Sequence, residues 1–123
     1  MVKKVEAVIR PDRLQAVQDA LDALGTSGLT VIEVLGCGRQ RGYTETYRGA
    51  RANISLQRKV KVEAVVIDSI ASAVVDAICG AACTGEVGDG KIFVLPVDDA
   101  VRIRSGEHGE DTVRHLQPEH WGH

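Results

Sequence analysis

The stretch KVKVEAVVIDSIASAVVDAICGAACTGEVGDGKIFVLPV, residues 59–97, decides the fold, because its hydrophobic period changes twice. From Lys59 to Ile67 small apolar residues alternate with charged residues, which predicts a half-buried strand. Asp68 is a plausible N-cap for an amphipathic helix that ends near Thr84-Gly85. After a glycine turn, Lys91 to Val97 predicts another strand. The stretch therefore predicts a strand–helix–strand unit.

The N-terminal part of the chain repeats this plan. Val2 to Arg10 alternates like a strand, and Pro11 to Leu24 carries apolar residues at the spacing of an amphipathic helix that Gly25 caps. Leu29 to Leu35 predicts the next strand, and Val101 to Arg104 could be a short fifth one. The order β-α-β-β-α-β predicts an α+β, ferredoxin-like sandwich: a four-stranded antiparallel sheet with both helices on one face.

Length and composition favour an oligomer of single-domain subunits. A chain of 123 residues with 3% aromatic residues builds a small core of Val, Ala, Ile and Leu. Val8 and Val65 lie on the sheet face away from the helices, and that face needs an apolar cover. We therefore expect association.

Charge and hydropathy exclude several classes of protein. The net charge of -2 argues against bulk binding of nucleic acid, and no apolar run approaches the roughly 20 residues of a membrane helix. The N-terminus lacks the apolar core of a signal peptide, so we expect a cytoplasmic protein.

Two segments show no regular period. Gly36 to Gln57 is glycine- and arginine-rich, and is either a functional loop or a mobile hairpin connection. Ser105 to His123 is polar and contains all four histidines, and we expect a mobile tail. The spacing of these histidines does not support a metal site.

Three groups of residues suggest anion binding. Gly88-Asp89-Gly90-Lys91 offers flexible backbone amides and a cation, although Asp-Gly also occurs in plain tight turns. Arg102 and Arg104 would point the same way on a strand, which suits a polyphosphate or merely a solvated face. Gly36 to Gly42 is rich in glycine but matches neither a P-loop nor a Rossmann fingerprint, so it is equally compatible with plain flexibility.

Catalytic constellations are scarce, and we expect no enzyme. The sequence has no Ser-His-Asp signal, no zinc motif and no evident carboxylate pair. Cys37, Cys79 and Cys83 are expected to be reduced thiols. The second and third should pack as small apolar groups on the buried side of their helix, whereas Cys37 is the more accessible thiol.

Taken together, these residues resemble the P-II nitrogen-regulatory signal proteins. The resemblance runs without gaps over about residues 1 to 107, which would form the P-II-like domain, with 108–123 as a polar tail. The stretches that carry it are Lys3–Pro11, Gly28–Val31, Gly38–Gly42, Thr44–Gly49, Lys59–Glu63, Thr84–Val94 and Val101–Glu107.

The resemblance implies a homotrimer whose clefts between subunits bind ATP and ADP competitively, with a T-loop at about 38–57 that contacts target proteins. It implies that Mg2+ is held by Gln40 together with the ATP phosphates. The implied nucleotide-binding residues are Thr30, Gly38, Arg39, Gln40, Val65, Gly88, Asp89, Gly90, Lys91, Arg102 and Arg104. The implied 2-oxoglutarate-binding residues are Gln40, Arg41, Gly42 and Lys59.

The partner implied by the resemblance is a regulated target such as an ammonium channel, a transporter or a metabolic enzyme, with no membrane insertion beyond peripheral recruitment. The T-loop departs from the family, because Ala52 replaces the usually modified tyrosine, Ala50 the alternative serine, and Arg51 an acidic residue. Tyr43 and Tyr47 remain as other possible modification sites. An alternative function is therefore a P-II-like paralogue that senses adenylates and another metabolite, such as bicarbonate in carbon uptake.

Overall fold

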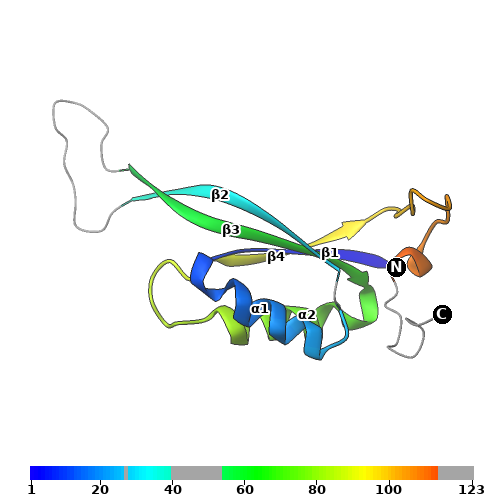
Figure 1. The fold of residues 1–123 in the computed structure, drawn as a ribbon, viewed down its shortest axis with the longest axis horizontal. Coiled ribbons are helices and arrows are strands. Elements are labelled where there is room, and N and C mark those ends of the chain that lie inside the picture. The colour runs from blue at the N-terminus through cyan, green and yellow to red at the C-terminus, as the bar shows by residue number, and fades with distance from the viewer. Residues whose placement is uncertain (27, 40–53, 114–123) are drawn as a thin grey trace.

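The computed structural model describes residues 1–26, 28–39 and 54–113. Figure 1 shows a twisted sheet with two helices packed side by side against one of its faces. The helices are α1 (Leu14–Ala23), preceded by the 3-10 turn Pro11–Arg13, and α2 (Asp68–Ala82). The strands are β1 (Val2–Ile9), β2 (Leu29–Arg39), β3 (Ile54–Ile67) and β4 (Lys91–Val97).

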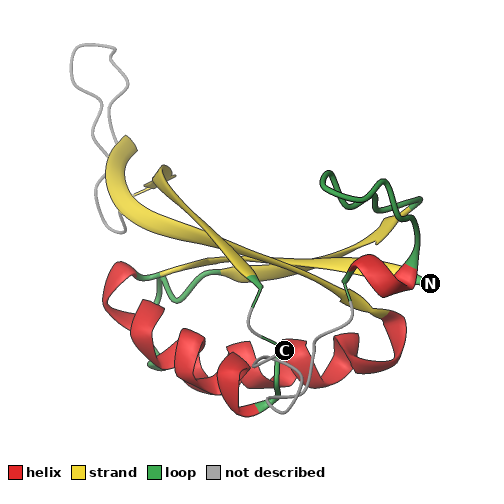
Figure 2. Ribbon diagram, turned by 45° about the vertical axis from the view of Figure 1, so that its right-hand side comes forward, coloured by secondary structure: helices red, strands yellow, loops and turns green. Residues whose placement is uncertain are grey.

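The sheet confirms the predicted ferredoxin-like order. Its strands are arranged β2-β3-β1-β4, and every neighbouring pair is antiparallel. The central pair is in register with Val5 opposite Ala64 and Ala7 opposite Val62. Figure 2 shows that both helices lie on the same side of the sheet, which leaves the other side of the sheet uncovered by helices.

The core lies between the sheet and the two helices, as the alternation predicted. The alternating residues of β1 and β3 are buried, and so is one side of each helix. Burial of such side chains stabilises a fold by roughly 1.5–3 kcal/mol each. The side chains that are at most 2% exposed are Val5, Ala7, Ile9, Val17, Leu21, Val62, Ala64, Val66, Val74 and Ile78.

The two hairpin strands extend further than the sequence predicted. β2 continues to Arg39 and β3 already begins at Ile54, so both enter the segment 36–57 that was expected to lack regular structure. Leu35 is 64% exposed and Leu56 is 63% exposed. Because this part of the hairpin is held by its backbone ladder rather than by a core, no alternating pattern marks it in the sequence.

Two helix and strand boundaries also differ from the prediction. Asp68 is the first residue of α2 rather than its N-cap, and no side chain caps that end of the helix. Its amide donates to the carbonyl of Met1 at 2.9 Å, and its carboxylate lies 3.6 Å from the Lys3 ammonium. The predicted fifth strand at 101–104 is only an isolated bridge between Val101 and His108, because the chain turns back at residues 103–105.

Residues 108–113, expected to be mobile, fold against the end of the sheet. They contain the 3-10 turn Glu110–Thr112 and an ion pair between the Met1 amine and Glu110. His108 belongs to this segment, whereas His115, His120 and His123 lie outside the described residues. No helix in the described ranges is long and apolar enough to cross a membrane.

Candidate functional site

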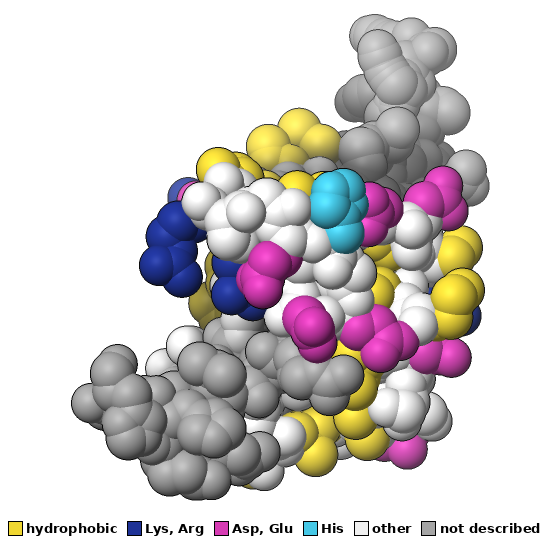
Figure 3. Space-filling model, turned by 90° about the vertical axis from the view of Figure 1, so that its right-hand side faces the viewer, with side chains coloured by type: hydrophobic (Ala, Val, Ile, Leu, Met, Phe, Trp, Pro, Cys, Tyr) yellow, Lys and Arg dark blue, Asp and Glu magenta, His cyan; other side chains and the backbone are white. Residues whose placement is uncertain are grey.

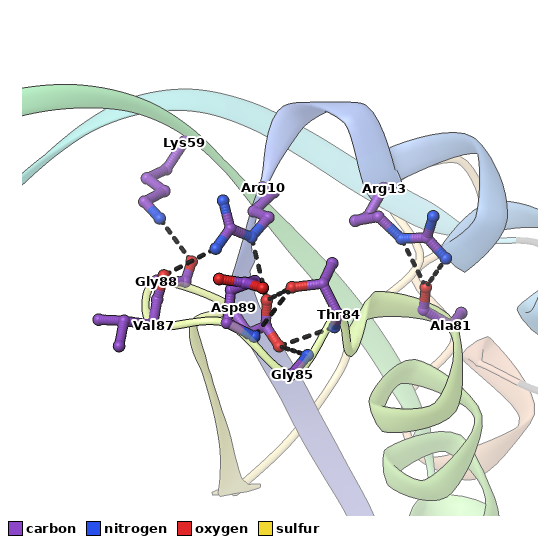
Figure 4. A network of polar contacts seen from close by, with 10 residues as sticks. Arg10, Arg13, Lys59, Ala81, Thr84, Gly85, Val87, Gly88 and Asp89 are labelled. Carbon is purple, nitrogen blue, oxygen red and sulfur yellow. Dashed lines mark hydrogen bonds and ion pairs between the residues drawn. The ribbon is translucent and has the colours of Figure 1, made fainter.

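A tight turn between α2 and β4 forms the most densely hydrogen-bonded polar cluster of the described chain (Figure 4). The Asp89 carboxylate is its centre. One carboxylate oxygen accepts hydrogen bonds from the amides of Thr84, at 2.7 Å, and Gly85, at 2.9 Å. The other oxygen accepts from the Thr84 hydroxyl and from Arg10 Nε, the latter at 3.0 Å. The carboxylate therefore ties both ends of the turn together and fixes it to the end of β1.

These bonds define the charge state of Asp89. The hydrogen bonds from the hydroxyl and amide of Thr84, followed by that from Arg10, hold the pKa of Asp89 well below its usual value near 3.8. The side chain is therefore a permanent anion and acceptor at neutral pH. Such a group organises a loop, and it cannot serve as a general acid.

Two positions in the turn require glycine. Gly90 has a φ of +104°, and a Cβ built there would lie 1.7 Å from the carbonyl oxygen of Val8. Gly88 has a φ of +100°, and its Cβ would lie 3.3 Å from an Arg10 nitrogen. The glycines thus allow the turn to pass directly over the end of β1.

Two cations hold the carbonyl side of the turn. Lys59 Nζ donates to the Gly88 carbonyl at 2.7 Å, and Arg10 Nη2 donates to the Val87 carbonyl at 2.7 Å. The amides of Gly88 and Gly90 donate no hydrogen bond to any other residue in the described ranges. A turn that combines such amides with Lys91 and neighbouring cations is chemically suited to an anion.

The arginines predicted to join this turn lie at the other end of the sheet. Lys91 begins β4 next to the turn, whereas Arg102 and Arg104 follow the end of the strand. Seven residues of strand span roughly 20 Å at about 3.3 Å per residue. The two groups therefore do not meet within one chain.

The side chains of Arg102 and Arg104 are not held parallel on a strand, contrary to the prediction. Arg104 lies in the turn at 103–105 and is exposed. Arg102 pairs with Glu107, at 3.4 Å, and donates to the Asp111 carbonyl at 3.0 Å. The prediction failed because the chain folds back here.

The segment that carries the arginines folds back, so that residues before and after the arginines contact each other. His108 Nδ1 lies 2.7 Å from an Asp99 carboxylate oxygen, and this contact lowers the pKa of Asp99. Figure 3 looks onto a face on which several acidic side chains lie to the right of and below the histidine that is coloured. The arginine segment therefore has a defined shape that the turn at 84–90 does not contact.

The remaining predicted site residues divide between these two ends. Val65 and Arg102 line one hollow, and Thr30 lies on the neighbouring strand opposite Glu63. Lys59 belongs to the turn cluster. The backbones of Gly38 and Arg39 end β2, and the structure does not describe their side chains. The predicted residues Gln40, Arg41 and Gly42 lie outside the described residues.

Sequence reasoning missed the roles of two residues of the turn cluster. Neither Arg10 nor Thr84 was predicted as a site residue. The signal was topological, because an antiparallel β1–β4 pair places the residue after β1 next to the turn that precedes β4. The Thr84 hydroxyl, five residues before Asp89, donates to the Asp89 carboxylate.

Comparison with known proteins identifies the family. The family model described as nitrogen regulatory protein P-II matches residues 2–107. The chain belongs to the P-II family. P-II proteins are signal-transduction regulators, and nucleotide binding is typical of them. The resemblance to the P-II family that the sequence indicated is therefore confirmed.

Individual P-II relatives match over most of their length. The nitrogen regulatory protein P-II of Cereibacter sphaeroides is 52% identical over 112 residues, which cover 91% of this chain and all of that protein. The P-II protein of Azospirillum brasilense is 50% identical over the same coverage. The crystal structure of Arabidopsis thaliana PII bound to citrate has 42% identity and a TM-score of 0.75, covering 90% of this chain and 91% of that one.

Proposed function

We propose that this P-II protein binds ATP and ADP competitively, binds 2-oxoglutarate together with Mg-ATP, and regulates a target protein through its T-loop. The observation that carries the proposal is the turn at 84–90. Its glycines adopt conformations that other residues avoid, and Asp89 fixes it against two cations. Such a built turn is suited to the phosphates of a nucleotide.

The proposed site lies between subunits of a homotrimer. Within one chain the turn and the arginines are at opposite ends of β4, so a second chain must supply one of the two groups. The uncovered sheet face supports association, because Phe93 is 50% exposed and Ile32 is 37% exposed on it. Between these apolar side chains lies an ion-pair network formed by Lys4, Glu6, Lys61 and Glu63.

Each predicted nucleotide residue has a role in this proposal. The backbone of Gly88, Asp89 and Gly90, together with Lys91, would bind phosphates of one nucleotide. Arg102 and Arg104 of a neighbouring subunit would reach the same phosphates as charged forks. The residues placed around the rest of the nucleotide are Thr30, Gly38, Arg39, Gln40 and Val65.

The proposed metabolite site adjoins the phosphates. Mg2+ binds proteins mainly through substrate phosphates and one or two side-chain oxygens, which here would include the Gln40 amide oxygen. Gln40, Arg41 and Gly42 would contact 2-oxoglutarate, and Lys59 would neutralise its distal carboxylate. Lys59 would then exchange the Gly88 carbonyl, which it now contacts at 2.7 Å, for the ligand. The citrate bound to Arabidopsis PII supports a carboxylate effector.

The altered sequence of the T-loop favours one alternative function. Ala50, Arg51 and Ala52 replace the residues that the resemblance led us to expect in the T-loop. A P-II-like paralogue that senses adenylates and another metabolite, such as bicarbonate in carbon uptake, would keep the turn at 84–90 and change its partner surface. In both cases we propose a cytoplasmic regulator rather than an enzyme, with an ammonium channel, another transporter or a metabolic enzyme as its target.

Calorimetric titration tests the proposal. Wild-type protein should bind ATP and ADP at the same site, and should bind 2-oxoglutarate with Mg-ATP but not with ADP. Lys59→Ala should abolish the 2-oxoglutarate signal and leave ADP binding measurable. Absence of nucleotide binding would refute the whole proposal. Nucleotide binding with a bicarbonate response and no 2-oxoglutarate response would establish the alternative.

A further inference from the structure

Two free thiols lie at the C-terminal end of α2: Cys79 in its last turn and Cys83 directly after the helix. Cys79 and Cys83 are both exposed, contrary to the prediction that they pack inside. The reason is the helical period, since Ile78 and Ala82 take the buried positions one residue earlier. Both thiols line one groove of about 390 Å³ between α2 and the start of β4.

The spacing of the two cysteines is better suited to a bridging ion than to a disulfide. Residues four apart on a helix have Cβ atoms roughly 5–6 Å apart, whereas a relaxed disulfide needs about 3.5–4.5 Å. The Cys83 amide donates to the Cys79 carbonyl at 3.1 Å, so this turn keeps its helical spacing. A metal ion between the sulfurs supplies the missing length, because a metal–thiolate bond is about 2.3 Å, as for zinc.

The surroundings select the kind of ion. In the described ranges no group of three or more Cys, His, Asp or Glu side chains could hold a metal ion, so this site offers two ligands. Asp89 also lines the groove, but its oxygens are already bonded to Thr84, Gly85 and Arg10. Two thiolates without a further protein ligand suit a soft ion of low coordination number, of which Cu(I) is the first-row example.

We propose that Cys79 and Cys83 bind one Cu(I) ion per chain as a bis-thiolate. Binding forms two Cu–S bonds and releases two thiol protons to solvent, with no change of oxidation state. Val75, Ile78 and Ile92 form apolar walls of the groove beside the two thiols, which themselves remain exposed to solvent. The groove borders Asp89, Gly90 and Lys91 of the proposed nucleotide turn, but neither cysteine is assigned to nucleotide binding, so the copper proposal does not rest on that function.

Anaerobic competition with a chromophoric Cu(I) chelator, bicinchoninate, tests the site on the reduced full-length chain. Wild-type protein should remove one equivalent of Cu(I) per chain. Cys79→Ser and Cys83→Ser should each weaken retention about 100-fold, the scale on which joining two ligands strengthens binding. Cys37→Ser, the matched control, should retain copper like the wild type.

A second readout makes the result decisive. Binding to two thiols should release two protons per ion in weakly buffered solution, measured with an indicator dye. Circular dichroism should show that the exposed serine substitutions leave the helices intact. Copper retention by the Cys79→Ser/Cys83→Ser double variant, or its loss in Cys37→Ser, would overturn the proposal.

Discussion

Arg102 and Glu107 are joined by both a backbone hydrogen bond and a side-chain ion pair. The Arg102 amide donates to the Glu107 carbonyl at 2.9 Å, and Arg102 Nη1 lies 3.4 Å from Glu107 Oε1. The two side chains are 38% and 49% exposed. A phosphate that approaches Arg102 must therefore compete with a carboxylate of the same chain.

Removing this carboxylate should strengthen nucleotide binding. Glu107→Gln leaves the backbone bond in place and removes the carboxylate charge from the Arg102 guanidinium, which keeps its hydrogen bond to the Asp111 carbonyl. Exposed ion pairs contribute about 0.2–1 kcal/mol, so we expect ATP and ADP to bind roughly 1.4- to fivefold more tightly in calorimetry. Asp98→Asn removes a charge nearby without breaking this pair and serves as the control. Equal gains in both variants would indicate a general charge effect instead.

Asp89 should make stability depend on acidity. Its pKa is lowered in the folded chain, so the unfolded chain binds more protons as pH falls below about 4. The stabilisation is fully present above that pH and is lost as pH decreases further. We expect Asp89→Asn to lower the thermal midpoint at pH 7 and to flatten its decline between pH 5 and pH 2.

Thr84→Val provides the matching control for Asp89. It removes the hydroxyl that contributes most to the lowered pKa and keeps the amide bonds. Its acid dependence should lie between those of the wild type and Asp89→Asn. If all three proteins lose stability in parallel on acidification, other carboxylates cause the effect.

Two glycine substitutions should have opposite effects. Gly90→Ala forces a Cβ against the Val8 carbonyl at a φ of +104° and should greatly lower the yield of folded protein or displace the turn. Gly80 lies in α2, where an added Cβ would meet nothing within 4 Å, so Gly80→Ala should stabilise the chain by about 0.5–1 kcal/mol. Urea denaturation measures both. Equal stability of the two variants would contradict the described turn.

A charge on the uncovered sheet face should prevent assembly. Phe93 lies opposite Glu6 on this face, so Phe93→Asp would place two carboxylates side by side. Light scattering of this variant should then give the mass of a single chain, whereas the wild type should give the mass of three chains. Leu24→Asp introduces the same charge at an exposed position on the helical side, at 44% exposure, and should leave the assembly intact. Dissociation of both variants would place the interface elsewhere.

The fold was predictable wherever burial imposes a period. Val60, Val62, Ala64 and Val66 occupy every second position of β3 because successive residues of the strand face the core and the outer side in turn, and all four are buried. The chain reversal at 103–105 leaves no such pattern. It depends on Gly106 and Gly109, both at positive φ, and on polar contacts that form only after folding.

The candidate site was predictable only in part. The Gly88-Asp89-Gly90-Lys91 turn was visible as a motif, but its partner Arg10 is 79 residues from Asp89 and joins it only through strand pairing. The thiols of α2 were misplaced by a single helical position, because both sides of that helix end are rich in small residues. One residue along a helix is a rotation of about 100°.

The hairpin of β2 and β3 extends beyond the core, and this has a consequence for how such a protein diverges. Its outer rows, with Leu35 and Leu56 largely in solvent, contribute little to the free energy of folding. Mutations in these outer rows therefore escape the selection that folding exerts on β1 or α2. A lineage can exchange one binding partner for another there while it inherits the rest of the molecule nearly unchanged.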